Sequence, residues 1–506
     1  MRGPHNIWRL IRTGATFERA GAMRVVLEAL DAPRPIRITA RIIGWPVQWL
    51  GLRGDPSQPP ILRALTALGP AYIKFGQLLS TRPDIVGVEL ATDLRILQDA
   101  LPAFDLDIAK AEVESELGIE IDEMFSSFSE PVAAASLAQV HKAVVRETGL
   151  TVAVKVLRPG IERAFLKDVD AFFLAASIIE AIAPFSRRLR PKAVIEHFAG
   201  VVDGELDLRM EASAADEFAA NTKDDEGFRV PALVWELSSR RVLTTEWVDG
   251  VPLGDVDAVL AIGSDPTEFA TRILQTFLRH ALRDGYFHAD MHQGNLMRGP
   301  DGDLIALDFG IMGRIDTYTR KVYAEILMGF LKRDYTRVAE AHFEAGYVPA
   351  DQDVAAFAQA LRSVGEPIFD YDASQVSMAR LFGHLFDVTE RFGMETRTEL
   401  ILLQRTMFVV EGVTRTFDPN LNMWDTSGPV IEKYIVDNLG PKAIARDLAA
   451  TIKVLARFGP RLPALAEAAL INLNEPSKPT RGNGSHVVWA ICGIALGIAA
   501  TLLFVG

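Results

Sequence analysis

Cysteine is nearly absent from this chain. The 506 residues include a single cysteine, Cys492, so the chain forms no intrachain disulfide and no cysteine-based zinc site. The chain also has no excess of basic residues, since it contains 53 Lys and Arg and 66 Asp and Glu, for a net charge of −13. General nucleic-acid binding requires cations that neutralise phosphates. We therefore expect no nucleic-acid partner.

Lysine is missing from the first 63 residues, but arginine is not. This segment holds ten arginines against four acids, so a basic leader precedes a more acidic body. Within residues 1–62, which read as helical, Trp8, Trp45 and Trp49 are interleaved with the arginines. The pattern is typical of a helix that lies on a membrane surface, and phospholipid is the partner we predict. A helix packed on the body with solvated arginines fits the pattern equally well.

Charge is absent from Val487–Val505, which is nineteen residues long. As a helix this segment spans about 28 Å, close to the roughly 30 Å hydrocarbon core of a bilayer. Cations precede it and none follow, which predicts a cytoplasmic body under the positive-inside rule. We expect a linker at 476–485 and a single transmembrane anchor at 486–506 in the inner (cytoplasmic) membrane. A Gly-x-x-x-Gly pattern in this tail also allows a homodimer.

The body between these ends divides into three further regions. Residues 63–125 read as a helical extension, residues 126–250 contain alternating strand-like runs, and residues 251–475 are nearly all helix apart from one hairpin. About 167–216, between the strand-like runs, reads as helical. A small mixed lobe followed by a large helical lobe is typical of kinases. The predicted fold is α+β: a protein-kinase-like two-lobed fold with an N-terminal helical extension and a C-terminal transmembrane helix.

The strongest chemical signal is a local one. The run from His288 to Asn295 is followed by Asp308-Phe309-Gly310, and a predicted hairpin at 296–307 separates the two. The hairpin brings Asn295 and Asp308 together as two hard oxygen ligands, which Mg2+ prefers. Asp290 is placed to accept a proton from an attacking hydroxyl or water. Phosphoryl transfer needs little beyond such positioning and charge neutralisation.

A rival interpretation takes His288, Asp290 and His292 as the ligands of a metal-dependent hydrolase. Side chains two residues apart on a strand do share a face. This hypothesis finds no further ligand and leaves Asn295 and the Asp-Phe-Gly run unexplained. The kinase-like interpretation accounts for all of them.

A lysine and an acid are expected upstream of this segment. Lys155 lies in the alternating run Thr151–Val156, where it is placed to reach the α and β phosphates of a nucleotide. A partly desolvated lysine needs a counter-charge. Asp207 and Glu211 are four residues apart and share a face of the predicted helix, whereas Glu205 points elsewhere if that helix is regular. We favour Glu211 as the partner of Lys155.

Glycine is absent where a phosphate-binding loop belongs. The segment 131–140 is rich in alanine, and alanine does not adopt positive φ cheaply, so this loop must cradle phosphates differently from a glycine-rich one. The run 241–247 is a second strand-like segment. The nucleotide-contacting residues that we predict besides Lys155 and Glu211 are Ala133, Ala134, Ala135, Ser136, Glu246 and Val248.

Together these motifs resemble one known family. The chain is similar to the UbiB family of atypical kinases (the ADCK group of eukaryotes), in its bacterial ubiquinone-biosynthesis branch, over about residues 60–420. The motifs that carry the resemblance are Lys74-Phe75-Gly76-Gln77, the alanine-rich loop, Glu205-x-Asp207, His288-x-Asp290-x-His292-x-Gly294-Asn295 and Asp308-Phe309-Gly310.

The resemblance implies ATP and Mg2+ as cofactors and a role in ubiquinone biosynthesis at the membrane. It also implies that Lys74 and Gln77 cap the active site, meet Glu205 or Asp207, and obstruct a peptide substrate. No Ala-Pro-Glu follows Asp308, which independently weakens the case for a peptide-docking segment. The expected partners are lipid intermediates and enzymes of the quinone pathway.

Three functional hypotheses follow. The first is a membrane-anchored atypical kinase or ATPase that acts on, or mobilises, lipid intermediates of ubiquinone biosynthesis. The second is a small-molecule kinase of the aminoglycoside or choline type, whose catalytic loop has the same pattern. The third is a nucleotide-gated scaffold of a biosynthetic complex, which the intact Asp290, Asn295 and Asp308 disfavour.

Overall fold

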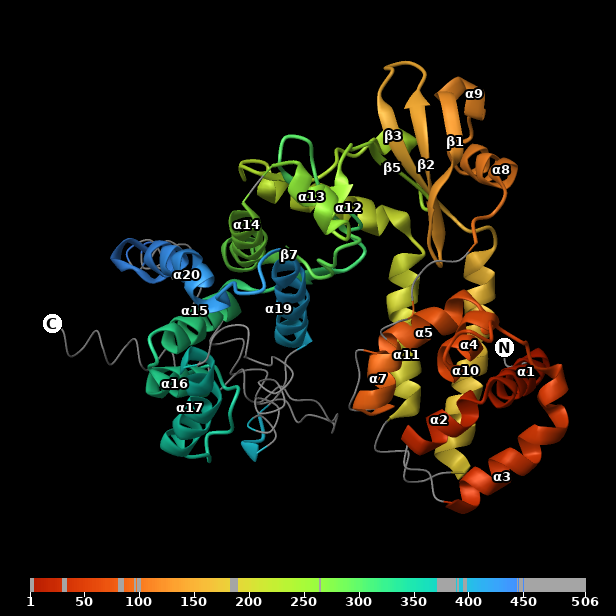
Figure 1. The fold of residues 1–506 in the computed structure, drawn as a ribbon, viewed down its shortest axis with the longest axis horizontal. Coiled ribbons are helices and arrows are strands. Elements are labelled where there is room, and N and C mark those ends of the chain that lie inside the picture. The colour runs from red at the N-terminus through yellow and green to blue at the C-terminus, as the bar shows by residue number, and fades with distance from the viewer. Residues whose placement is uncertain are drawn as a thin grey trace, which may run out of the picture.

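The computed structural model of the chain places two lobes beside a body of N-terminal helices (Figure 1). Within the part of the chain that the model describes, no helix is both long enough and apolar enough to cross a bilayer. The expected linker at 476–485 and the expected anchor at 486–506 lie outside the described residues. These residues are 4–29, 34–80, 86–94, 97, 102–182, 190–263, 265–370, 388, 391–394, 398–443, 445 and 449.

The N-terminal helices form one body rather than two regions. Its elements are α1 (Pro4–Ala20), α2 (Ala22–Ala29), α3 (Arg34–Gly44), the 3-10 helix η1 (Trp45–Leu50), α4 (Pro60–Leu68), α5 (Pro70–Ser80) and α7 (Val88–Leu94). The boundary expected at residue 62 falls inside α4. Ala22 of α2, Leu62 of α4 and Tyr72 of α5 belong to one buried apolar cluster, so α2, α4 and α5 share a core.

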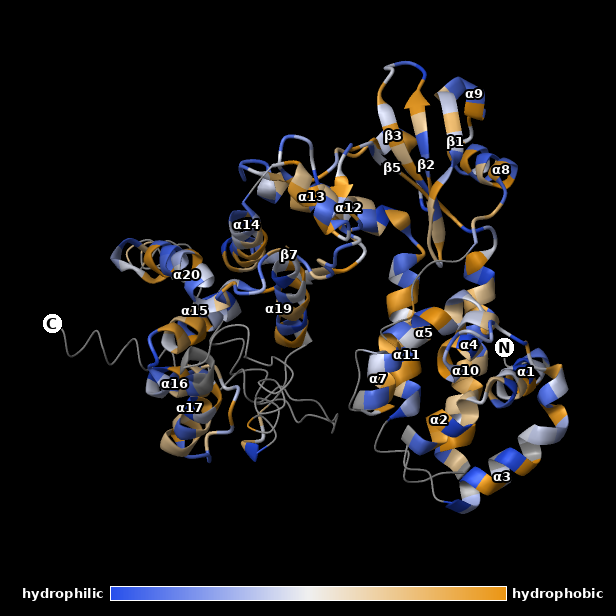
Figure 2. Cartoon of the chain, in the orientation of Figure 1, coloured by the Kyte–Doolittle hydropathy of each residue, from blue (hydrophilic) through white to orange (hydrophobic). Residues whose placement is uncertain are grey.

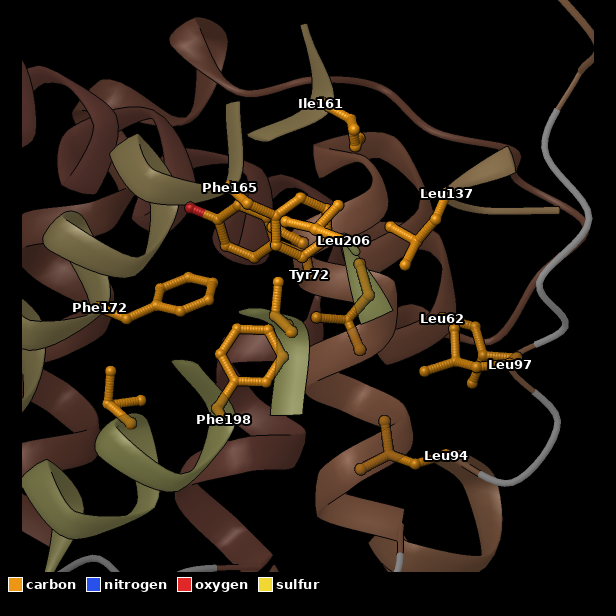
Figure 3. Packing of buried hydrophobic residues seen from close by; sticks show 14 of the residues in the cluster. Leu62, Tyr72, Leu94, Leu97, Leu137, Ile161, Phe165, Phe172, Phe198 and Leu206 are labelled. Carbon is orange, nitrogen blue, oxygen red and sulfur yellow. The ribbon is translucent and has the colours of Figure 1, made fainter. Parts of the chain in front are cut away.

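That core extends into the neighbouring lobe. Phe165 and Phe172 of α10 (Ile161–Ile182) and Phe198 of α11 (Pro191–Glu205) pack into the same cluster. Figure 3 shows Leu137, from the alanine-rich hairpin, in the same packed group as Leu62. The helical body is therefore joined by apolar burial to the segment where a phosphate loop was expected.

A four-stranded antiparallel sheet forms the small lobe. Its order is β1 (Phe125–Ala134), β2 (Ala138–Val145), β3 (Thr151–Leu157) and β5 (Val242–Glu246). The alternation predicted for β3 is confirmed, because Val152, Val154 and Val156 are buried in a cluster with residues of α8 (Leu106–Leu117) and α9 (Ile121–Met124). Lys155 alternates to the opposite face of the sheet.

The helical character expected over about 167–216 is confirmed in the described residues, but this region is not one continuous helix. In the part of this connection that the structure describes, the helical region is divided among α10, α11 and α12 (Leu208–Thr222). The chain breaks between Glu205 and Leu208 because Asp207 caps α12, its carboxylate accepting a hydrogen bond from the backbone N–H of Arg209. Glu205 and Asp207 therefore do not share a helix with Glu211, and their directions are set by the break.

The large lobe is mostly helical and contains the predicted hairpin. The pairing of β8 (Leu296–Arg298) with β9 (Leu304–Ala306) confirms that hairpin. A second pair, β7 (Tyr286–His288) with β10 (Met312–Arg314), lies next to it in the chain. The remaining elements, in chain order, are β4 (Phe228–Arg229), η3 (Trp235–Leu237), β6 (Val251–Pro252), α13 (Val256–Ala261), α14 (Pro266–Arg279), the π-helix η4 (His280–Asp284), α15 (Thr317–Leu331), α16 (Tyr335–Glu344), α17 (Val354–Asp370), α19 (Thr398–Phe417) and α20 (Met423–Leu439).

Candidate active site

His288 ends strand β7 and organises the segment that follows. Its Nε2 donates to the carbonyl of Leu307 at 2.9 Å, and its Nδ1 accepts the backbone N–H of Asp290 at 3.1 Å. Burial lowers the pKa of His288, which keeps the ring neutral as this pattern requires. Both ring nitrogens are thus engaged by backbone groups, so the interpretation of His288 as a metal ligand is wrong. In the described residues no cluster of three or more His, Cys, Asp or Glu side chains is arranged to hold a metal.

Asp290 and Asn295 are held together by the turn between β7 and β8. The amide nitrogen of Asn295 donates to the backbone carbonyl of Asp290 at 3.1 Å and approaches its Oδ2 at 3.4 Å. The Asp290 side chain is half-buried. The amide nitrogen is committed to Asp290, so the amide oxygen is the Asn295 atom that can face a cation.

Asn295 directly precedes β8, and Asp308 follows β9 with only Leu307 between them. Because Leu296 pairs with Ala306, the two residues flank the same end of the hairpin. Asp308 has φ of 56°, a left-handed conformation that is uncommon for a residue with a Cβ and that clusters at functional sites. Its Oδ1 accepts the N–H of Gly310 at 3.2 Å. Phe309 is buried against Phe218 of α12, which fixes this turn beneath the helix that carries Glu211.

Lys155 joins the two lobes. Its Nζ lies 2.8 Å from both carboxylate oxygens of Glu211, the pairing favoured from the sequence, and 3.4 Å from Oδ2 of Asp308. Burial opposes the positive charge of Lys155, but Asp308 and Glu211 outweigh it and hold its pKa above the ordinary value. Burial raises the pKa of Glu211, against the lowering effect of Lys155. The contacts to both oxygens favour the ionised pair.

The charge state of Asp308 depends on these neighbours. Lys155 is the main cause of a pKa lowered to about 2, opposed by burial and assisted by the Gly310 N–H, His288 and Lys74. Asp308 is therefore a carboxylate across the physiological range. An ionised, half-exposed carboxylate beside an amide oxygen is a donor set that suits Mg2+.

Helix α5 carries the Lys-x-Gly-Gln motif toward this site. Nζ of Lys74 forms an ion pair with Oε2 of Glu205 at 3.0 Å, one of the two partners expected. The other, Asp207, is not that partner: its carboxylate binds the guanidinium of Arg209 at 2.6 Å and caps α12. Gln77 donates to the carbonyl of Leu97 at 3.2 Å and so contributes to the packing of α5.

Gly76 lets α5 approach its neighbours. A Cβ at this position would lie 2.5 Å from a methyl of Leu97 and 2.8 Å from a methyl of Leu65, both in the core. Gly200, inside α11, is also a helical glycine, but a Cβ there would meet nothing within 4 Å. Both glycines therefore have helical backbone conformations, and they differ only in how closely neighbouring side chains pack against them.

We expect Gly76→Ala to destabilise the protein and Gly200→Ala to stabilise it. At Gly76 the cost of overpacking, about 1–3 kcal/mol, exceeds the gain in helix propensity of roughly 1 kcal/mol. At Gly200 only that gain remains. The measurement is the free energy of unfolding of both variants in urea. Equal shifts in the two variants would show that α5 is not tightly packed at Gly76.

The alanine-rich loop is a β-hairpin turn without left-handed residues. None of the described non-glycine residues with positive φ lies between β1 and β2, as expected for alanine. Ala133 and Ala135 are exposed, Ala134 is half-buried, and Ser136 is buried. Arg158, which the sequence interpretation missed, donates to the carbonyls of Ala135 and Pro102, both at 2.9 Å. The only sequence feature that could have indicated this role for Arg158 is its position directly after β3.

Glu246 and Val248 lie where β5 passes into the large lobe. The carboxylate of Glu246 is paired with Arg229 of β4. A cavity of about 220 Å3 adjoins this crossing, and Trp247, Asp249 and the β8–β9 turn also line it. None of Lys155, Asp290, Asn295 or Asp308 lines that cavity, so it is separate from the chemical centre.

We expect Lys155→Met to destabilise the protein by roughly 3 kcal/mol at neutral pH, because it leaves buried Glu211 without its partner. The lowered pKa of Asp308 stabilises the fold above its unfolded pKa of about 3.9, and this contribution is lost as pH falls toward about 2. The deficit of the variant should therefore shrink as pH falls from about 4 toward about 2, as measured by urea unfolding.

Lys142→Met is the matched control, since Lys142 lies on the adjacent strand β2 over the ring of Trp247. It should cost about 1 kcal/mol or less and show no such pH dependence. A Lys155→Met deficit that stays constant with pH would refute the electrostatic coupling to Asp308.

Comparison with known proteins finds two family models and a related fold. Residues 96–342 match the model of the ABC1 atypical kinase-like domain, and residues 361–422 match the model of the UbiB helical domain. Together the two models cover more than half of the chain. A solved structure of Rv3197 from Mycobacterium tuberculosis, described as its complex with erythromycin, superposes with a TM-score of 0.51. The identity is 23% over 78% of this chain and 98% of that chain, which shows a shared fold.

Proposed function

Because the chain belongs to the UbiB family of atypical kinases, we propose that it is a membrane-anchored kinase or ATPase that binds Mg·ATP and supports ubiquinone biosynthesis. The observation that carries the catalytic part is the continuous contact from Glu211 through Lys155 to Asp308. This contact joins the small lobe to the metal-binding turn of the large lobe. Such an ion pair is the arrangement that phosphoryl-transfer enzymes of this fold require.

The residues present fit Mg·ATP. Asp308 and Asn295 would hold the metal through a carboxylate and an amide oxygen, and Lys155 would face the α and β phosphates. When bound, Mg·ATP supplies the phosphoryl group together with the cation that neutralises its charge. The alanine-rich hairpin occupies the place in the chain where a phosphate loop is expected, and Arg158 binds its backbone at the carbonyl of Ala135. We assign this backbone the role of the phosphate loop.

The chain's own residues then have separate tasks. Lys155 is held by Glu211, so it stays charged and in place without being able to act as a base. Asp290 accepts the proton of the attacking hydroxyl or water. The side-chain amide of Asn295 keeps the Asp290 carboxylate oriented. His288, neutral and engaged on both nitrogens, is a positioning residue that ties Asp290 to β9.

The acceptor is proposed to be a lipid intermediate or water rather than a protein. Lys74 is close enough to Asp308 to lower its pKa, and its ion pair with Glu205 fixes α5 beside the site. A helix in that position restricts the approach of a folded protein substrate. The quinone-pathway enzymes would then be partners that receive the lipid product, and the absence of Ala-Pro-Glu after Asp308 agrees with this.

The membrane part of the proposal is supported by the sequence of 486–506. We propose a single C-terminal span that leaves the body in the cytoplasm. The full chain should then resist extraction from membranes by alkaline carbonate, whereas a chain truncated after Ser485 should be extracted. Extraction of both forms would refute an integral anchor.

The test of the proposed function is the ubiquinone profile, by mass spectrometry, of a strain that lacks the gene. The strain is complemented with the wild-type protein or with the Asp308→Asn variant. Restoration by the wild type alone would support nucleotide chemistry in quinone synthesis. Equal restoration by both would favour a scaffold, and an unchanged profile on deletion would refute the quinone role. Accumulation of a phosphorylated small metabolite with wild type would instead indicate a small-molecule kinase.

A further inference from the structure

The N-terminal body exposes a row of large apolar side chains. Helix α3 and the 3-10 helix η1 follow one another without a break, and four residues at spacings of four, three and four project from them. The spacings of four and three from Ile38 to Trp45 place those side chains on one face of an α-helix. Trp45 and Trp49 both project from the 3-10 helix η1. The exposed fractions are 60% for Ile38, 67% for Ile42, 68% for Trp45 and 72% for Trp49. We call these four residues the α3–η1 face.

This exposure is unusual for residues of this kind. Tryptophan is highly buried on average, and single exposed apolar residues are common but contiguous rows are not. Two tryptophans in such a row favour an interface that is apolar on one side and wet on the other, because the indole ring has an apolar body and a polar N–H. The membrane–water interface is the environment in which tryptophan is enriched for this reason.

The charges on the same segment point to an anionic partner. Residues 34–50 contain Arg34, Arg37 and Arg41 and no aspartate or glutamate, while the whole chain is acidic at −13. Arg34 and Arg41 are exposed. A helix with arginines beside a Trp and Ile face is the type that lies in the plane of an anionic leaflet.

The α3–η1 face is held in place by the rest of the body. Arg19 of α1 donates to the carbonyl of Gly51 at 2.8 Å, and the backbone N–H of Leu52 donates to Oγ1 of Thr16 at 3.0 Å. A Cβ at Gly51 would lie 2.4 Å from the carbonyl oxygen of Ala15, so only glycine allows this close approach. The face is therefore a fixed surface of the folded protein.

Its position leaves it accessible. Figure 1 shows α3 at the outer edge of the N-terminal body, remote from the large lobe, and Figure 2 shows hydrophobic and hydrophilic residues along it. None of the residues of the candidate active site lies on α3 or η1.

We propose that the α3–η1 face docks on the surface of an anionic phospholipid bilayer, with Trp45 and Trp49 at the headgroup level and the arginines facing lipid phosphates. This contact is peripheral and is independent of the proposed catalytic function. It is also distinct from the proposed C-terminal span, since it is built from the other end of the chain.

The test uses the full chain with one spin label. Because Cys492 is the only cysteine, Cys492→Ser gives a cysteine-free background. Ile42→Cys carries the nitroxide in one sample. Val436→Cys carries it in the control, because Val436 lies on α20 and is exposed to a similar degree, at 68% against 67% for Ile42. Both proteins are reconstituted in vesicles of phosphatidylcholine with or without phosphatidylglycerol. Power-saturation EPR compares contact of the label with oxygen, which concentrates in lipid, and with a water-soluble nickel complex.

The expected result is a label at position 42 that is oxygen-accessible and shielded from nickel in the anionic vesicles, with the control label remaining in water. Removing charge by Arg34→Gln and Arg41→Gln should lower the equilibrium constant for docking about fivefold for each arginine. Both substitutions lie on the surface, and ATP turnover, measured alongside, reports separately on the catalytic proposal.

Three results would overturn the docking proposal. The first is equal nickel access at positions 42 and 436 in anionic vesicles. The second is a short distance between labels on two chains, which would assign the face to a second copy. The third is a label that is immobilised and shielded without any vesicles, which would assign the face to another segment of the same chain.

Discussion

Asp308→Asn should lower Mg-dependent nucleotide hydrolysis by at least about 10²-fold, because the amide removes the negative charge that holds the metal. The carboxylate that is lost is ionised, half-exposed and lies 3.4 Å from Lys155. The substitution preserves shape, and asparagine tolerates the left-handed backbone that residue 308 adopts. The fold should therefore survive while the metal site does not. Steady-state turnover at several Mg2+ concentrations is the measurement.

Asp301→Asn is the matched control for this variant. Asp301 is an exposed aspartate in the turn of the same β8–β9 hairpin, seven residues before Asp308. Its substitution makes the same chemical change and should leave turnover within about twofold, since surface substitutions have small effects. Near-normal turnover by Asp308→Asn would contradict the metal assignment and leave the residue with a structural role.

Asp290→Asn should lower the maximal rate of hydrolysis by about 10²-fold or more while leaving nucleotide affinity nearly unchanged. General-base catalysis contributes a factor of that order, and asparagine cannot accept the proton. The backbone carbonyl that binds the Asn295 side chain at 3.1 Å is untouched by the substitution, so the metal ligand should stay in place. Single-turnover rates and equilibrium binding of Mg·ATP, measured on the same preparation, separate the two effects.

Two other outcomes would change the role of Asp290. An unchanged rate would demote it from base to a residue that orients Asn295. A loss of nucleotide affinity equal to the loss of rate would place it among the binding groups instead. Restoration of a measurable rate at high pH, where hydroxide replaces a base, would support the assignment of Asp290 as the general base.

The geometry of the candidate catalytic segment was predictable because it is local. The hairpin turn, the spacing from Asp290 to Asn295 and the position of Asp308 all lie within nineteen residues of one another. Turn chemistry and the strand period of two fix such geometry without help from distant parts of the chain. The alternation of β3 likewise placed Lys155 opposite a valine face. For these features local pattern and tertiary structure agree.

The acids on the helices were less predictable. A regular helix over 167–216 puts Asp207 and Glu211 on one face, but the structure ends α11 at Glu205 and begins α12 at Leu208. The cap at Asp207 was available in the sequence, because Asp before a helical run is a known start signal. The direction of the Glu205 side chain could not be predicted from the sequence, because it depends on how α11 packs on α10 and α5.

By itself the sequence determined the candidate catalytic residues, the likeness to the UbiB family and the basic and apolar character of the two ends, because these depend on spacing and composition over short stretches. Only the tertiary structure decided that Lys74 meets Glu205 and not Asp207, that Leu137 ties the alanine-rich hairpin to the helical body, and that Trp45 and Trp49 stay in solvent. Lys74 and Glu205 are 131 residues apart in the chain. Contacts at such separations come from the packing of whole helices, which no short pattern specifies.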